Sequence, residues 1–271
     1  MDLHPLTLLK HSFSAFRLNR GFLLAGAVAY NALLSLVPMM ALILVVLSQL
    51  FETEPLIAML AESLKHFAPN QVEIIINQLI YFIDNWKLIG VLGVFSLLLF
   101  SSFAFSVLEG AMQVIFHRRS RVNPRHIMIS VGLPYLYIVA LAIGLVLLTA
   151  LASVFQSLPD AKYSNISLYL LGVLGEVVIL TSFYKILPAG KLAWSHAVLG
   201  GITATILWEI SRTLLVWYLS TVSVVNIVYG TFATTIVILL CFEVAAIILL
   251  FGAQVIAEYE HDLDGHYMED F

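Results

Sequence analysis

Cysteine and charge are the two things this sequence has least of. Its 271 residues include one cysteine, Cys241, which excludes a disulfide framework and a cysteine-rich metal site. Charged residues make up 11% of the chain and hydrophobic residues 61%. A soluble domain has about 25% charged and about 45–50% apolar residues. With a mean hydropathy of +0.98, the composition predicts an integral membrane protein.

Signatures of common enzymes and of nucleic-acid binding are missing as well. The sequence has no P-loop, HExxH, GxSxG or kinase pattern, which argues against ATP hydrolysis and against those catalytic classes. No basic domain indicates a nucleic-acid partner. The histidines fall outside the expected membrane centres, and the acidic end of the chain is interpreted as solvated. We therefore expect no catalytic site, no metal site and no cofactor.

Long apolar runs dominate what is present. A helix needs about 20 apolar residues to cross a bilayer. The segments that qualify are 22–50, 88–116, 127–155, 166–187, 195–220 and 229–257. They predict an all-α membrane protein with six transmembrane helices in a single domain, residues 1–271.

The basic residues predict an orientation. Lys and Arg concentrate before the first helix, in the loop 117–126 and around 185–191, and positive loops stay in the cytoplasm. Both termini are then cytoplasmic, and residues 258–271 form an acidic cytoplasmic tail. Residues 52–87, between the first two membrane helices, show apolar spacing typical of a short amphipathic helical hairpin on the outer side. A structural cap is the favoured interpretation of that hairpin, with a substrate gate as the alternative.

Four ionisable residues fall near the middle of predicted membrane helices. They are Glu176, Glu209, Arg212 and Glu243. Arg212 stays protonated and can neutralise one carboxylate, and Glu209 is its neighbour at i, i+3. Glu176 and Glu243 must then be protonated, share Arg212 or face water. Such groups mark substrate or ion pathways, although a Glu–Arg pair can also simply fasten helices together.

Polar residues add to this pattern on two helices. Thr205 lies one turn before Glu209, and Asn31 lies on the first helix, before Pro38. The sequence therefore predicts a polar intramembrane cavity with these side chains and the ionisable set as its substrate-binding or transport residues.

Two stretches resemble the YihY/BrkB family of bacterial inner-membrane proteins. "AGAVAYNALLSLVP" is similar to the opening signature of that family, through Tyr30, Ser35 and Pro38 among others. "FYKILPAGKLAWSHAVLGGITATILWEISRTLL" is similar to its C-terminal block, in which Trp208 and Glu209 match an "L-W-E" element. Glu243 stands where the family usually has an aromatic pattern, and Gln254 where it usually has Glu.

The resemblance implies a six-helix protein of the bacterial inner membrane, linked to the cell envelope and without a settled activity. Members have been described as virulence factors, transporters and a ribonuclease; the last finds no support in these residues. The leading hypothesis is a transporter or flippase-like protein for a lipid or another amphipathic, anionic molecule. Its expected partners are membrane lipids and envelope proteins, with no nucleic acid. Alternatives are a non-transporting scaffold of an envelope assembly and a lipid-acting enzyme that uses Glu109.

Overall fold

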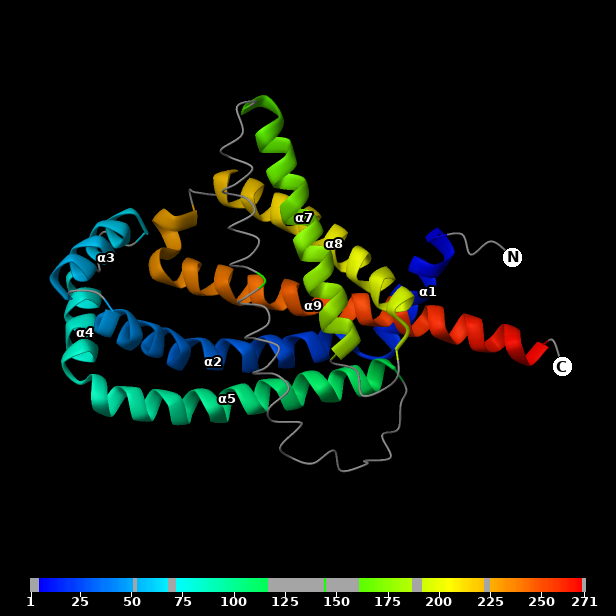
Figure 1. Cartoon of the computed structure of the whole chain (residues 1–271), viewed down its shortest axis with the longest axis horizontal. Coiled ribbons are helices and arrows are strands. Elements are labelled where there is room, and N and C mark those ends of the chain that lie inside the picture. Colours follow the sequence, from blue (N-terminus) through cyan, green and yellow to red (C-terminus); the bar gives the residue numbers. More distant parts are fainter. Residues whose placement is uncertain are drawn as a thin grey trace. The chain divides into compact units, whose positions relative to one another are not determined.

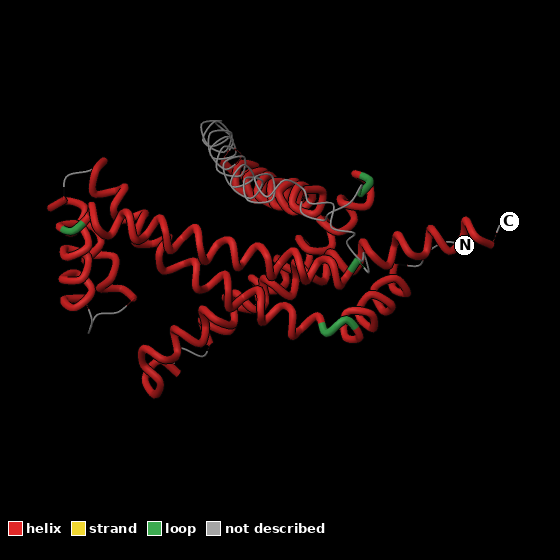
Figure 2. The backbone as a smooth tube through the Cα atoms, turned by 90° about the horizontal axis from the view of Figure 1, so that it is seen from below, coloured by secondary structure: helices red, strands yellow, loops and turns green. Residues whose placement is uncertain are grey.

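The structure is a computed structural model that describes residues 5–50, 53–67, 72–116, 161–186, 192–221 and 225–269, together with Gly144. The regular structure of these residues is entirely α-helical (Figure 2). The helices, labelled in Figure 1, are α1 (Pro5–Leu18), α2 (Gly21–Leu50), α3 (Thr53–Phe67), α4 (Val72–Asp84), α5 (Trp86–Ile115), α7 (Ala161–Ile186), α8 (Trp194–Thr221) and α9 (Val225–Glu269).

Five stretches within the described helices are long and apolar enough to cross a membrane. They are Gly21–Leu50, Trp86–Ile115, Ser167–Ile186, Trp194–Tyr218 and Val237–Asp262. Each overlaps a segment predicted from hydropathy, which confirms the all-helical membrane class. Apart from Gly144, the predicted helix 127–155 lies outside the described residues, so the total of six stays a prediction.

The segment between the first two apolar helices is helical, as the amphipathic spacing predicts. α3 and α4 pack against each other, and α4 passes into α5 through Asn85. The Asn85 side-chain amide donates to the carbonyl of Tyr81 over 2.9 Å, and its own carbonyl accepts the amide of Ile89. The placement of this pair of helices on the outer side stays a prediction.

The C-terminal end differs from the expected tail. The predicted membrane helix ends at residue 257, whereas α9 continues to Glu269. Residues 258–269 thus extend the last helix. Glu and His side chains are compatible with a helix once it has been nucleated, so a fall in hydropathy marks the limit of a membrane run and not the end of the helix.

The described chain divides into two compact units. One comprises Met1–Ala29 with Phe105–Phe271, and the other comprises Tyr30–Ala104. In the first unit α7 packs against α8, and both α8 and α1 pack against α9. The single domain expected from the sequence is not decided by this division and stays a prediction.

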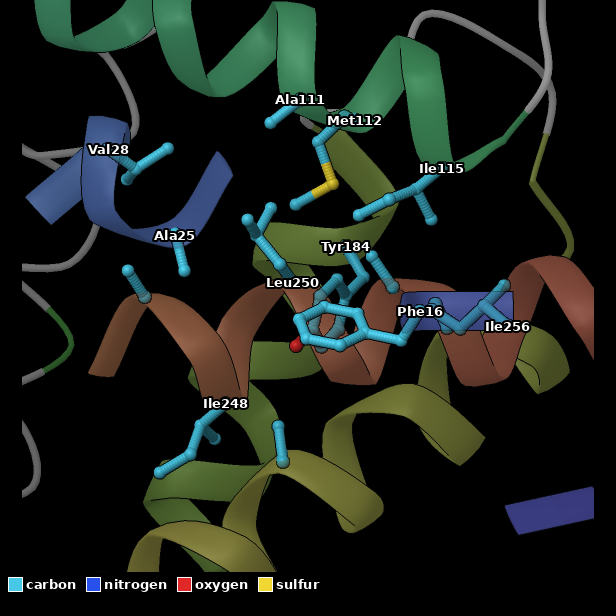
Figure 3. Packing of buried hydrophobic residues seen from close by; sticks show 14 of the residues in the cluster. Phe16, Ala25, Val28, Ala111, Met112, Ile115, Tyr184, Ile248, Leu250 and Ile256 are labelled. Atoms are coloured by element: carbon cyan, nitrogen blue, oxygen red, sulfur yellow. The ribbon is translucent and has the colours of Figure 1, made fainter. Parts of the chain in front are cut away.

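The core of the first unit gathers around α9. Figure 3 shows Met112 and Ile115 pointing from α5 toward Tyr184 and Leu250, and all four side chains are buried. The Tyr184 hydroxyl donates to the carbonyl of Leu249 over 2.8 Å, so this buried polar group is satisfied. Phe16 of α1, also buried, packs edge-on against Phe251 of α9.

A short turn positions α1 for this contact. Arg20 has a φ of 55°, a left-handed conformation that ends α1 and lets α2 begin at Gly21. A Cβ at Gly21 would lie 2.3 Å from the Phe16 ring, so only glycine fits there. Beside the turn, the Asn19 side-chain amide donates to Gln254 of α9 over 3.0 Å.

Glycines allow α8 to approach both of its neighbours. A Cβ at Gly201 would lie 2.2 Å from Thr181 Oγ1 and 3.0 Å from the Thr181 backbone nitrogen, on α7. A Cβ at Gly200 would lie 2.4 Å from Ile256 of α9. Small residues at such crossings are a common means of helix association in membranes, where apolar burial drives little.

Gly201→Ala should therefore destabilise the protein. The methyl group meets the backbone of Thr181, and overpacking of this kind costs about 1–3 kcal/mol. The measurement is the unfolding free energy, or the midpoint of thermal unfolding, in detergent. Gly172→Ala is the matched control, because nothing lies within 4 Å of its added Cβ on α7. Equal stability of the two variants would contradict the close contact of α7 with α8.

Candidate functional site

The carboxylate of Glu209 is the centre of a polar cluster between α7 and α8. The Tyr169 hydroxyl donates to Glu209 Oε2 over 2.8 Å. The Arg212 guanidinium donates to the same oxygen over 2.6 Å, from one helical turn further along α8. The guanidinium carbon also lies 5.8 Å from the centre of the Tyr169 ring, within the range of a cation–π contact. Each of the three side chains, Tyr169, Glu209 and Arg212, thus contacts the other two.

Glu176 joins this cluster from α7. Its carboxyl group interacts directly with Glu209 and electrostatically with Arg212. One of its oxygens, Oε2, is buried and has no hydrogen-bond partner among the residues that the structure describes. The cluster therefore holds two carboxyl groups and one guanidinium, so one carboxyl group is in excess over the available positive charge.

The two halves of the ion pair differ in exposure. The Glu209 side chain is 18% exposed, whereas that of Arg212 is 47% exposed. The Glu209 carboxylate is thus partly covered, and the more exposed guanidinium keeps donors free for a further partner. An accessible guanidinium that already holds a carboxylate is suited to binding an anion by exchange.

The other predicted site residues are Thr205, Glu243 and Asn31, and the first two do not join the cluster around Glu209. Thr205 is buried and donates its hydroxyl to the carbonyl of Gly201 over 2.9 Å, so it serves the packing of α8. Glu243, half-buried on α9, makes no hydrogen bond or ion pair with another described residue. Asn31 belongs to the unit Tyr30–Ala104 and is described apart from the cluster. The structure thus brings together Glu176, Glu209 and Arg212; the transport roles of the whole set stay predictions.

Tyr169 is the cluster residue that sequence reasoning missed. A usable signal existed, because Tyr169 and Glu176 are seven residues apart and share one face of a helix. A second missed contact lies at the other end of α8, where His196 Nδ1 is 3.4 Å from Glu260 Oε1 of α9. The His196 ring also meets Tyr259 edge-on. This second contact fixes α8 to the extended part of α9.

Two further predictions concern catalysis and metals. Glu109, the candidate for a lipid-acting enzyme, is half-buried in α5. Across the described ranges, no three His, Cys, Asp or Glu side chains come together as a possible metal site.

Apolar helices that carry a charged cluster define a polytopic helical membrane protein. Within that class, the chain belongs to the Virulence factor BrkB family, which it matches over residues 12–269. This confirms the resemblance noted from the two sequence stretches.

Relatives include UPF0761 membrane proteins of several bacteria. That of Aggregatibacter aphrophilus is 26% identical, with 86% of this chain aligned to 84% of the relative. That of Nitrosospira multiformis is 29% identical, with 86% of this chain aligned to 56% of the relative. That of Chlorobium luteolum is 26% identical, with 89% aligned to 57%. The chain thus spans little more than half the length of the last two. No solved structure matches the chain.

The bond between Tyr169 and Glu209 should be measurable as a coupling energy. Tyr169→Phe and Glu209→Gln, made singly and together, should show a coupling of about 0.6 kcal/mol, the average for interhelical hydrogen bonds in a membrane. The measurement is the unfolding free energy of each variant in a double-mutant cycle.

Tyr218→Phe, combined with Glu209→Gln, is the matched control for this cycle. Tyr218 lies more than two turns further along α8, so its effect should add to that of Glu209→Gln without coupling. Equal coupling in the two cycles would argue against the contact between α7 and α8.

Proposed function

We propose that this protein moves a lipid or another amphipathic, anionic molecule across the membrane, as a transporter or flippase-like protein. One observation carries the proposal. Arg212, in an apolar helix, is about half exposed and is held by a carboxylate that an anionic ligand could replace. Intramembrane ionisable groups commonly mark the paths of substrates and ions.

The chemistry of exchange follows from the geometry of the cluster. With no ligand bound, Glu209 neutralises Arg212 and so lowers the cost of placing a charge in the membrane. A phosphate or carboxylate head group competes for the same donors, because a guanidinium can bind either in a bidentate manner. Tyr169 donates to the displaced Glu209 and keeps one hydrogen bond to its carboxylate. The polar cavity that such exchange needs is part of the proposal.

The competing interpretation is a fastener between helices. Tyr169 and Glu209 do link α7 to α8, and such a bond stabilises a membrane protein by about 0.6 kcal/mol. A fastener, however, requires neither the second carboxyl group at Glu176 nor an accessible cation. Both add electrostatic cost without improving the link, which favours a role in ligand exchange.

The proposal includes a location and partners. In this proposal the protein lies in the bacterial inner membrane with both termini in the cytoplasm, the orientation that the positive-inside rule predicts from the basic residues, and its partners are membrane lipids and proteins of the envelope. Membership of the Virulence factor BrkB family and relatives named as membrane proteins support a membrane location. The alternative function is a membrane scaffold for an envelope assembly, for which the extension of α9 beyond the apolar run offers a docking element.

Lipid flipping in proteoliposomes tests the transport function. Phosphatidylglycerol with a fluorescent head-group label is placed in both leaflets, and a membrane-impermeant reductant reports the label that reaches the outer leaflet. Wild type should accelerate this movement over protein-free vesicles. In Arg212→Gln, loss of a charge-assisted hydrogen bond costs about 1.5–3 kcal/mol, so the rate should fall by about tenfold or more.

Lys87→Gln is the matched control, because it removes a positive charge from the exposed end of α5. It should flip the label at the wild-type rate. A wild type no faster than empty vesicles would overturn the transport function and favour the scaffold. A normal rate in a folded Arg212→Gln variant would show that the cluster is not the ligand site.

A further inference from the structure

We infer that Glu176 holds a proton that it shares with Glu209, and that uptake of a further proton by this carboxyl pair accompanies the binding of an anion at Arg212. The inference deepens the proposed function and rests on it, since it names the proton as the coupled ion.

The charges within the cluster lead to this inference. The groups that act on Glu176 are Glu209 and Arg212 of α8, and Glu209 is also held by Tyr169 of α7. If both carboxyl groups were ionised, two negative charges would meet beside one positive charge in a low-dielectric environment. A proton between the carboxyl groups removes that repulsion, as it does when two carboxyl groups share one site in a soluble enzyme.

The hydrogen bonds of Glu209 explain why the proton is placed on Glu176. Glu209 Oε2 already accepts from Tyr169 and from Arg212, and two such bonds, one of them charge-assisted, favour the ionised form of Glu209. Glu176 accepts no such pair of donors, and its Oε2 is buried without a partner among the described residues. A buried oxygen in that situation is tolerated far better on a neutral acid than on a carboxylate.

Binding of an anion then changes the net charge of the cluster. With the site empty, the ion pair and the protonated Glu176 are together neutral. When an anion takes Arg212, Glu209 loses its counter-charge and the cluster gains a net negative charge. Uptake of about one proton per anion by the carboxyl pair restores neutrality in the membrane interior. Release of the anion returns Arg212 to Glu209 and releases that proton.

Infrared spectroscopy of the full-length protein in lipid tests the resting proton without requiring transport. Wild type at neutral pH should show a carboxylic-acid C=O band that is lost in Glu176→Gln and shifts in D2O. Glu62→Gln is the matched control, because Glu62 is exposed on α3 and its removal should leave that band unchanged. A wild-type band unaltered by Glu176→Gln would overturn the inference.

A proton gradient across the proteoliposomes tests the coupling. Flipping of labelled phosphatidylglycerol toward the alkaline side should be faster with the gradient in wild type and insensitive to it in a folded Glu209→Gln variant, because Glu209 is the carboxylate that takes up the further proton. Wild-type flipping that ignores the gradient would overturn the coupling and leave the proposed function standing. An absence of wild-type flipping would overturn both, so the two failures can be told apart.

Discussion

The close approach of α8 to α7 at Gly201 sets the position of every charged side chain in the cluster. The two helices are antiparallel, so counting equally along both from the contact of Thr181 with Gly201 brings Tyr169 level with Thr213, beside Arg212. The same count brings Glu176 level with Ile206, about one turn from Glu209. A residue advances a helix by about 1.5 Å, so side chains of this length span the remaining steps. A packing contact between small residues thus produces an electrostatic arrangement further along the same helices.

α8 divides its roles along its length. One face of its first half is closely packed: Gly200, Gly201, Ala204 and Thr205 are buried, and His196 contacts Glu260. Its second half carries Glu209 and the accessible Arg212, with hydrophobic neighbours such as Ile210 and Leu214 exposed. The packed half fixes the position of α8 along α7, and the other half exposes the Arg212 guanidinium. Substitutions in the two halves are therefore expected to affect different properties, stability in the first and ligand exchange in the second.

Sequence reasoning captured what depends on local pattern. Five of the six predicted apolar runs overlap described helices that are long and apolar enough to cross a membrane, and the i, i+3 spacing predicts the pair of Glu209 with Arg212. It missed what depends on register between helices. Tyr169 joins the cluster only because of the contact at Gly201, and Thr205, on the same stripe as Glu209, turns out to bond to its own helix. The continuation of α9 to Glu269 was missed because hydropathy reports burial in lipid and not helix formation.

The excess carboxyl group decides between a fastener and a functional site. If Glu209 and Arg212 existed only to join helices, a neutral residue at position 176 would remove repulsion and a buried, unpartnered oxygen at no cost to the link. The ion pair would also be better protected from water if Arg212 were covered as far as Glu209 is, whereas the Arg212 side chain is more than twice as exposed. Both features become advantages once an anion displaces Glu209. The accessible cation receives the anion, and the resting proton on Glu176 leaves Glu209 as the one carboxylate that must take up a proton to keep the cluster neutral.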